Sequence, residues 1–338
     1  MNAVVLYQDE KLGFKCTKVP KPKVEPGCLI MKVLASAINN VDEYIVHRLF
    51  PVNFKNADYI CCGLEGSGIV EEVGEGVPKE FIGKKIVCTT LGGDPSKTFG
   101  CWCEYAKIPL GQCFLIDEKI PSEEACNFYA NPLTCLWLIE IAKRSGVKAL
   151  IHTNGSSQIG KFLIKEGIAE KIDIINIVRS KENVEVLKNL GAKYVLNSTD
   201  ADFSQNLQKL ASELDAKLVL DCIGGDFIGK ILPSVPYQTK VVFYGALGGN
   251  ISSLDMMTLA IKDITLKGYM MGNDDFLKDP PLLKQKLEYI AESIKTKRNF
   301  VTDVASRFTL DKAEEALGIF KKISSKGKVI FIPHYKPE

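Results

Sequence analysis

The stretch ALIHTNGSSQIGKFLIKEG, residues 149–167, decides the fold of the second half of this chain. An apolar run is followed by a short turn rich in Gly and Ser, and then by residues with the apolar spacing of a helix. Gly155 and Gly160 lie on either side of the turn, where a missing Cβ lets a helix approach the strand closely. The stretch predicts a strand–turn–helix unit whose backbone amides can bind a phosphate, at Ser156, Ser157, Gln158 and Ile159.

Continuous β-branched runs alternate with helical stretches along the rest of this half. Runs such as INIV and KLVLDCI are apolar on both faces, which is typical of strands that are covered on both sides. The expected strands are residues 149–153, 174–178, 194–197, 218–222, 241–245 and 264–269. The pattern predicts an α/β domain with a Rossmann doubly wound parallel sheet over residues 121–297.

The first 120 residues have a different sequence pattern. Short β-segments at 3–7, 28–38, 68–73, 85–89 and 103–108 are separated by Pro and Gly, which predicts a barrel-like all-β domain. Residues 298–338 are too few for a domain of their own. We therefore expect the chain to return and complete the first domain.

Composition and charge exclude several classes of partner. The chain of 338 residues has 43 Lys and Arg against 41 Asp and Glu, a formal net charge of +2. This balance predicts neither a nucleic-acid nor a membrane partner. The longest uncharged segment, residues 125–139, contains two Asn and a Pro and is shorter than the roughly 20 apolar residues of a membrane span. The N-terminus has no leader-like pattern, so we predict a cytoplasmic protein with reduced cysteines.

The residues after the second strand of the sheet indicate which dinucleotide is bound. Rossmann domains that bind NAD usually carry an acidic residue there, about 20 residues beyond the glycines, on the ribose hydroxyls. This chain has Arg179, Ser180 and Lys181 instead. An arginine can hold the 2′-phosphate with two hydrogen bonds, so NADPH is the predicted cofactor.

Two further strand ends carry small residues. LVLDCIGGD and VVFYGALGG each finish a strand and continue into a glycine pair. Their position at the sheet edge predicts that Ile223, Tyr244 and Gly245 lie near the nicotinamide.

Together these segments resemble the medium-chain dehydrogenase/reductase superfamily, in its zinc-independent branch of quinone oxidoreductases and 2-enoyl thioester reductases. The similar segments run through the whole chain, in order: KVLASAINNVDEY, GLEGSGIVEEVGEGV, GCWCEYAKIP, NPLTCLWL, INIVRSKENVEVLKNLGAKYVLN, DCIGGD, YGALGG and KGKVIF. The resemblance implies a GroES-like β-barrel domain beside the Rossmann domain. It also implies NADPH-dependent reduction of a small-molecule quinone or activated C=C (enone) in an interdomain cleft, usually by a homodimer.

The resemblance also suggests catalytic residues. Asn39 and Asp42 match the family's Asn-Pro-x-Asp segment, with Asn40 in place of Pro, and Thr134 matches a hydroxyl near the nicotinamide. A plain capped turn is the alternative interpretation of Asn39 and Asp42. No metal is predicted, because Leu64 stands where zinc-dependent members have a histidine ligand.

One departure leaves alternatives open. The tyrosine of the enoyl thioester reductases falls on Phe50, which cannot donate a proton, and Ser157 and Gln158 replace a glycine pair in the phosphate turn. We expect the turn to bind a dinucleotide nevertheless. The alternatives are a 2-enoyl thioester (acyl-CoA or acyl-carrier-protein) reductase, and a non-catalytic structural or interaction protein that retains the fold within a protein assembly.

Overall fold

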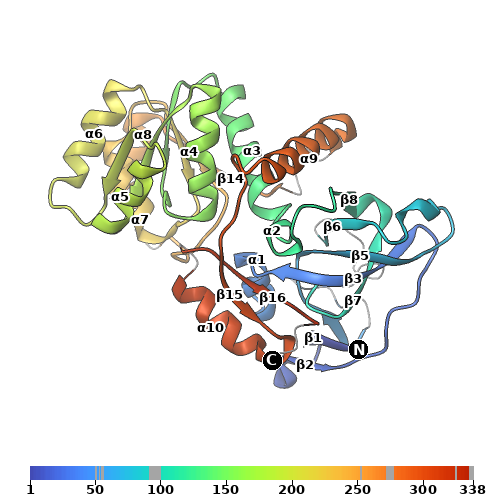
Figure 1. Cartoon of the computed structure of the whole chain (residues 1–338). Coiled ribbons are helices and arrows are strands. Elements are labelled where there is room, and N and C mark those ends of the chain that lie inside the picture. The colour runs from blue at the N-terminus through green and yellow to red at the C-terminus, as the bar shows by residue number, and fades with distance from the viewer. Residues whose placement is uncertain are drawn as a thin grey trace. The chain divides into compact units, whose positions relative to one another are not determined.

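The structure, a computed structural model, describes residues 1–49, 52, 54, 57–90, 100–251, 253–271, 278–323 and 326–334. The chain divides into two compact units (Figure 1). Unit 1 comprises Met1–Leu133 and Lys284–Glu338, and unit 2 comprises Thr134–Leu283. The predicted boundaries were 120/121 and 297/298, so both ends of the predicted Rossmann segment lie in unit 1.

Specific contacts hold these two ends in unit 1. The backbone amides of Tyr129 and Ala130 donate to the Glu65 carboxylate at 2.8 and 3.0 Å. Lys295, the last residue of α9 (Pro280–Lys295), pairs with Asp117 at 2.8 Å. Neither contact has a local sequence signal, so the bounds predicted from composition differ from those of the two compact units.

Unit 2 contains one six-stranded sheet with the order β11-β10-β9-β12-β13-β14, and its neighbouring strands are parallel. The strands are β9 (Ala149–His152), β10 (Asp173–Val178), β11 (Tyr194–Asn197), β12 (Leu218–Asp221), β13 (Lys240–Phe243) and β14 (Thr265–Gly268). The helices are α3 (Ala130–Arg144), which begins in unit 1, α4 (Gln158–Glu170), α5 (Lys181–Asn189), α6 (Phe203–Glu213), α7 (Gly225–Ile231) and α8 (Met256–Lys262). The predicted parallel α/β sheet is confirmed.

Burial across this sheet explains why its strands could be predicted. Every residue of the central strands β9 and β12 is buried, whereas β14 at the end of the order is largely exposed. From β9 the chain adds β10 and β11 on one side of the sheet, and it then adds β12, β13 and β14 on the other side. The strand order therefore reverses between β9 and β12. Open α/β sheets bind ligands at such a point, beyond the carboxyl ends of the strands.

Unit 1 is built from two sheets. One has the order β2-β1-β4, and the other has β15-β16-β3-β5-β6-β8 with β7 paired to β3. The strands are β1 (Asn2–Tyr7), β2 (Phe14–Lys18), β3 (Cys28–Ala37), β4 (Tyr59–Cys61), β5 (Glu65–Val73), β6 (Lys85–Thr89), β7 (Tyr105–Pro109), β8 (Cys113–Leu115), β15 (Val304–Phe308) and β16 (Lys328–Phe331). The helices are α1 (Asn40–Val46), α2 (Ser122–Ala125), α9 (Pro280–Lys295) and α10 (Ala313–Ile323). β16 pairs with β3, so the C-terminal strands complete the N-terminal sheet (Figure 1).

The uncharged segment 125–139 lies mostly in α3 and is core, with Trp137 and Leu138 fully buried. Within the described residues, no helix is both long and apolar enough to cross a membrane.

Candidate functional site

The predicted phosphate turn joins β9 to α4 in unit 2. Ser157 is the N-cap of α4, with φ −66° and ψ 164°, and its Oγ accepts from the Gly160 amide at 3.0 Å. The same hydroxyl donates to the Asn154 carbonyl at 2.8 Å. Ser157 therefore stabilises the turn itself, and its hydroxyl is already occupied.

Gln158 causes no strain at its position. It is the first residue of α4, and no residue of 153–160 is among the described positions with positive φ. Glycine is required only where φ is positive or where another atom approaches closely. The turn therefore keeps its backbone shape with side chains at Ser156, Ser157, Gln158 and Ile159.

Gly155 and Gly160 are needed for close packing. A Cβ on Gly160 would lie 2.3 Å from the Gly155 carbonyl oxygen, and a Cβ on Gly155 would lie 2.9 Å from the Asn176 Cβ. Both distances are well inside van der Waals contact. The two glycines thus bring α4 against the turn, and the turn against β10.

The end of β10 carries the predicted 2′-phosphate residues. Arg179 follows the last paired residue of β10, and its side chain is exposed. Ser180 is the N-cap of α5 and accepts from the Asn183 amide at 3.2 Å, and Lys181 is exposed in the first turn of α5. This arrangement presents two cations and a helix N-terminus at the carboxyl edge of the sheet, which suits an anionic group.

The loops after β12 and β13 lie against one another. The amide of Gly225 donates to the Gly249 carbonyl at 3.0 Å, and the amide of Gly248 donates to the Ile223 carbonyl at 2.6 Å. Gly245 lies close to Cys222, where a Cβ would be 3.0 Å from the Cys222 Cβ. These contacts bring Ile223, Tyr244 and Gly245 to the same sheet edge as the phosphate turn.

A histidine that the sequence interpretation did not assign lies at this edge. His152, the last residue of β9, is fully buried, and its Nε2 lies 2.6 Å from the Tyr244 hydroxyl. Burial lowers the pKa of His152 to about 3. The available signal was a histidine at the end of an otherwise apolar strand, in a chain with only three histidines.

In unit 1, Asn39 and Asp42 are both buried at the start of α1. The Asp42 carboxylate accepts from the backbone amides of Asn39 at 2.8 Å and Leu64 at 2.7 Å. Burial raises the pKa of Asp42 to about 7. Asp42 therefore caps the turn that begins α1 and also binds the backbone at Leu64, immediately before β5. This agrees with the capped-turn interpretation.

Asn39 belongs to a larger buried polar cluster, whose members are Asn39, Asp42, Glu65 and Lys328. The Asn39 amide nitrogen donates to Glu65 at 2.9 Å, and its oxygen accepts from the Lys328 ammonium. Burial raises the pKa of Glu65 and lowers the pKa of Lys328. Glu65 and Lys328 were not assigned from the sequence, although each is a charged residue at the start of a strand, β5 and β16 respectively.

The remaining predicted catalytic residue, Thr134, is half-buried on α3 and belongs to unit 2. Phe50, on which the missing tyrosine falls, lies outside the described residues.

The donor set of unit 1 does not fit a catalytic zinc. Leu64, between Gly63 and Glu65, is buried and offers no ligand atom. Burial raises the pKa of the Cys61 and Cys62 thiols, which favours their protonated form. Among the described residues, no three His, Cys, Asp or Glu side chains are arranged to hold a metal ion.

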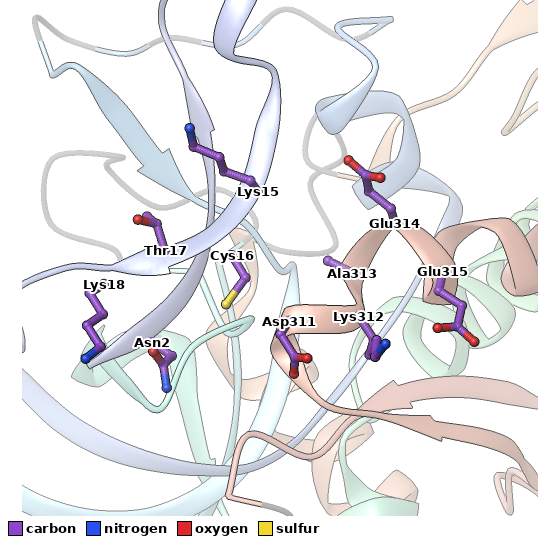
Figure 2. Close-up of a pocket in the computed structure, with 10 residues that line it drawn as sticks. All are labelled: Asn2, Lys15, Cys16, Thr17, Lys18, Asp311, Lys312, Ala313, Glu314 and Glu315. Carbon is purple, nitrogen blue, oxygen red and sulfur yellow. The ribbon is translucent and has the colours of Figure 1, made fainter.

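Unit 1 also has a surface cavity of about 630 Å³ between β2 and the start of α10, shown in Figure 2. Its charged residues are three lysines and three acids: Lys15, Lys18, Lys312, Asp311, Glu314 and Glu315. It contains none of the predicted site residues. Because its charges are balanced, it favours no charged ligand.

Two protein families match the two parts of the chain. Residues 25–118 match the alcohol dehydrogenase GroES-like domain, and residues 158–285 match the zinc-binding dehydrogenase family. A relative in Caenorhabditis elegans, named as a mitochondrial enoyl-[acyl-carrier-protein] reductase, is 26% identical over 287 residues. That alignment covers 83% of this chain and 79% of the relative.

Solved structures share the fold over nearly the whole length. The quinone oxidoreductase of Escherichia coli, complexed with NADPH, superposes with a TM-score of 0.84 at 18% identity, covering 98% of this chain and 100% of that one. A 2-haloacrylate reductase superposes with a TM-score of 0.78 at 17% identity, covering 99% and 100%. At such identities the likeness establishes the fold, with its GroES-like and Rossmann parts.

Proposed function

The chain belongs to the medium-chain dehydrogenase/reductase superfamily, and on this premise we propose that it is a zinc-independent, NADPH-dependent oxidoreductase. Its substrate would be a quinone or an activated C=C compound such as an enone. The observation that carries the proposal is the exposed Arg179 at the carboxyl end of β10, where an enzyme that uses NAD would carry an acid.

In this proposal, residues at the carboxyl edge of the unit 2 sheet bind the 2′-phosphate, the pyrophosphate and the nicotinamide of the cofactor. Arg179, with Ser180 and Lys181, would hold the 2′-phosphate. The amides of Ser156, Gln158 and Ile159 would hold the pyrophosphate, since those of Ser157 and Gly160 donate within the turn. Ile223, Tyr244 and Gly245 would contact the nicotinamide end. When bound, NADPH supplies the hydride, and the protein contributes binding and orientation.

The roles of the predicted catalytic residues follow from their hydrogen bonds. Asn39 and Asp42 use their polar atoms within the buried polar cluster, so we propose that they shape the substrate site and do not exchange protons with substrate. Thr134 remains a proposed hydroxyl near the nicotinamide. The proton that completes reduction of an enone would come from water, since Phe50 cannot supply one.

Two kinds of relative support the substrate class. The Escherichia coli structure is described as a quinone oxidoreductase, and the haloacrylate enzyme is named for a substrate with an activated C=C bond. The Caenorhabditis elegans relative supports the second candidate, a 2-enoyl thioester reductase. The phenylalanine at position 50 favours the first candidate.

We also propose a homodimer that forms through the outer edge of the unit 2 sheet. β14 is the last strand of the sheet order, and α8 directly precedes it in the chain. Three apolar side chains of α8 are exposed: Met256, Met257 and Ile261, by 66, 63 and 59%. Apolar residues at this level of exposure are typical of a surface that another chain covers. The cytoplasmic location stays a prediction from the sequence.

The test is a calorimetric titration of the protein with NADPH and with NADH. We expect NADPH to bind more tightly, and Arg179→Ala to weaken NADPH about tenfold or more while leaving NADH unchanged, since a charge-assisted bond to the 2′-phosphate is lost. Screening of quinones, enones and enoyl thioesters would then identify the substrate. Absence of binding by either nucleotide would refute the enzyme proposal and favour a non-catalytic interaction protein.

A further inference from the structure

His152 and Tyr244 form a pair at the point where the strand order of unit 2 reverses. His152 ends β9, and Tyr244 follows the last residue of β13, with β12 between the two strands. The Nε2 of His152 lies 2.6 Å from the Tyr244 hydroxyl oxygen, and the ring planes differ by only 17°. The pair therefore spans the strand ends at which this class of sheet binds its ligand.

The surroundings of His152 determine which ring nitrogen carries hydrogen. Burial lowers the pKa of His152 to about 3, so the ring is neutral at physiological pH. Its Nδ1 is buried and has no hydrogen-bond partner among the residues that the structure describes. A buried N–H without an acceptor is rarer in proteins than an unused lone pair. The hydrogen therefore belongs on Nε2, and His152 donates to the Tyr244 oxygen.

This direction of donation leaves the hydroxyl hydrogen of Tyr244 available. Among the described residues, the Cys222 side chain also lies beside this hydroxyl, and a thiol sulfur is a weak acceptor. Burial raises the pKa of Tyr244 well above its usual value, so the group stays a hydroxyl and a donor. The backbone of Tyr244 is held by donation of its amide to the Asp221 carbonyl at 2.8 Å. A stronger acceptor beside this hydroxyl would take its hydrogen in place of the sulfur.

We propose that Tyr244 donates a hydrogen bond to a carbonyl oxygen of the bound ligands, and that His152 is the positioning residue that orients this hydroxyl. The carbonyl belongs to the nicotinamide carboxamide or to the substrate. The inference rests on the proposed function, because both ligands come from it. It assigns a role to His152 and a specific donor atom to Tyr244.

The first test measures the tautomer without any ligand. Nitrogen-15 NMR of the wild-type protein, with the His152 signals assigned by their loss in His152→Gln, is expected to show hydrogen on Nε2 from about pH 5 to pH 9. Hydrogen on Nδ1 would overturn the inference, because Tyr244 would then donate to His152 and have no hydrogen for a ligand.

The second test titrates variants with NADPH and NADH and measures enone reduction. Tyr244→Phe is expected to weaken one of the ligands about threefold to tenfold, the value of one net hydrogen bond. Equal weakening of both nucleotides would identify the carboxamide as the acceptor, whereas unchanged nucleotide binding with a higher KM for the enone would identify the substrate carbonyl. No change in either quantity would overturn the proposal.

Two matched changes separate positioning from general damage. His152→Leu removes the donor and is expected to reproduce the loss seen in Tyr244→Phe, while His152→Gln keeps an N–H near the Nε2 position and is expected to restore most of it. Tyr237→Phe, at a tyrosine that is 60% exposed, is the control and is expected to bind as the wild type does. Equal loss in the Leu and Gln variants would overturn the positioning role.

These results can be told apart from a failure of the proposed function. Arg179→Ala changes the ratio of NADPH to NADH affinity, whereas Tyr244→Phe leaves that ratio unchanged because both nucleotides carry the same carboxamide. If the wild type binds neither nucleotide, the proposed function and the ligand role of Tyr244 both fail. The tautomer measurement still reports on the His152–Tyr244 pair in that case.

Discussion

The buried polar cluster of unit 1 and the carboxyl edge of the unit 2 sheet both contain polar and charged side chains, but these side chains have different surroundings. In the cluster, the polar atoms of Asn39 and Asp42 bond to Glu65, Lys328 or nearby backbone amides. At the sheet edge, Arg179 is exposed, and the Tyr244 hydroxyl lies beside the weakly accepting Cys222 sulfur. Polar residues with strong partners inside the fold stabilise it, whereas exposed or weakly partnered donors are better placed to bind a ligand.

Because their surroundings differ, mutations in the two regions should affect different measured quantities. A buried ion loses much of its hydration and is stabilised only by its partners, so changes in the cluster should appear in folding stability. Changes at the sheet edge should appear in nucleotide affinity. The following variants test that division, beginning with the largest expected effect.

Lys328→Met should be the most destabilising of these changes. It removes the cation that faces Asn39, Glu65 and Asp42, and loss of one partner of a buried charged group costs about 3–5 kcal/mol. Urea unfolding at pH 7 measures it. Lys326→Met, two residues away at an exposed position, is the matched control and should stay within about 0.5 kcal/mol of the wild type. Equal effects of the two would mean that the cluster is not a stabilising unit.

Asp42 should make stability depend on pH. Burial foremost, with the nearby Glu65 carboxylate adding to it and Lys328 opposing it, raises the pKa of Asp42 from 3.8 to about 7 in the folded chain. Between these values the folded state binds more protons than the unfolded state, so this contribution is full below about pH 4 and lost as the pH rises to about 7. Asp42→Asn should remove that part of the slope between pH 4 and pH 7 in urea unfolding.

The exposed Asp202→Asn variant is the control for removing a carboxylate. A wild-type slope in Asp42→Asn would show that Asp42 ionises in the folded protein as it does in the unfolded chain.

Gly160→Ala and Gly318→Ala should have opposite signs although the chemical change is the same. A Cβ at position 160 would lie 2.3 Å from a backbone oxygen, which predicts a loss of about 1–3 kcal/mol and weaker binding of both nucleotides. A Cβ at position 318, inside α10, meets no atom of the described residues within 4 Å and should stabilise the fold by about 0.5–1 kcal/mol. Thermal unfolding with nucleotide titration measures both. A tolerated Gly160→Ala would contradict the close approach of α4 to the turn.

Ser157→Ala should cost about 1 kcal/mol of stability, because it removes the N-cap of α4. NADPH affinity should not fall, since the hydroxyl is bonded to Gly160 and Asn154. Ser156→Ala tests the neighbouring hydroxyl in the same titration. A selective loss of NADPH affinity in Ser157→Ala would make this residue a phosphate ligand and not a cap.

The sequence predicted unit 2 better than unit 1, for a physical reason. A parallel strand covered on both faces must be apolar along its length, so β9, β10 and β12 are visible as continuous runs. The short strands β2, β4 and β8 were missed. Their residues are half-buried or exposed, so neither a continuous run nor an alternating pattern marks them.

The sequence by itself determined the α/β fold, the glycine-bounded turn, the cation at position 179 and the leucine at the zinc-ligand position. These features are local, because each depends on residue type and on spacing within one strand–turn–helix unit. Only the tertiary structure decided that Lys328 meets Asn39, across 289 residues, and that His152 meets Tyr244, across 92. Such contacts depend on how strands align and pack in the folded chain. No local sequence pattern predicts which distant residues will meet.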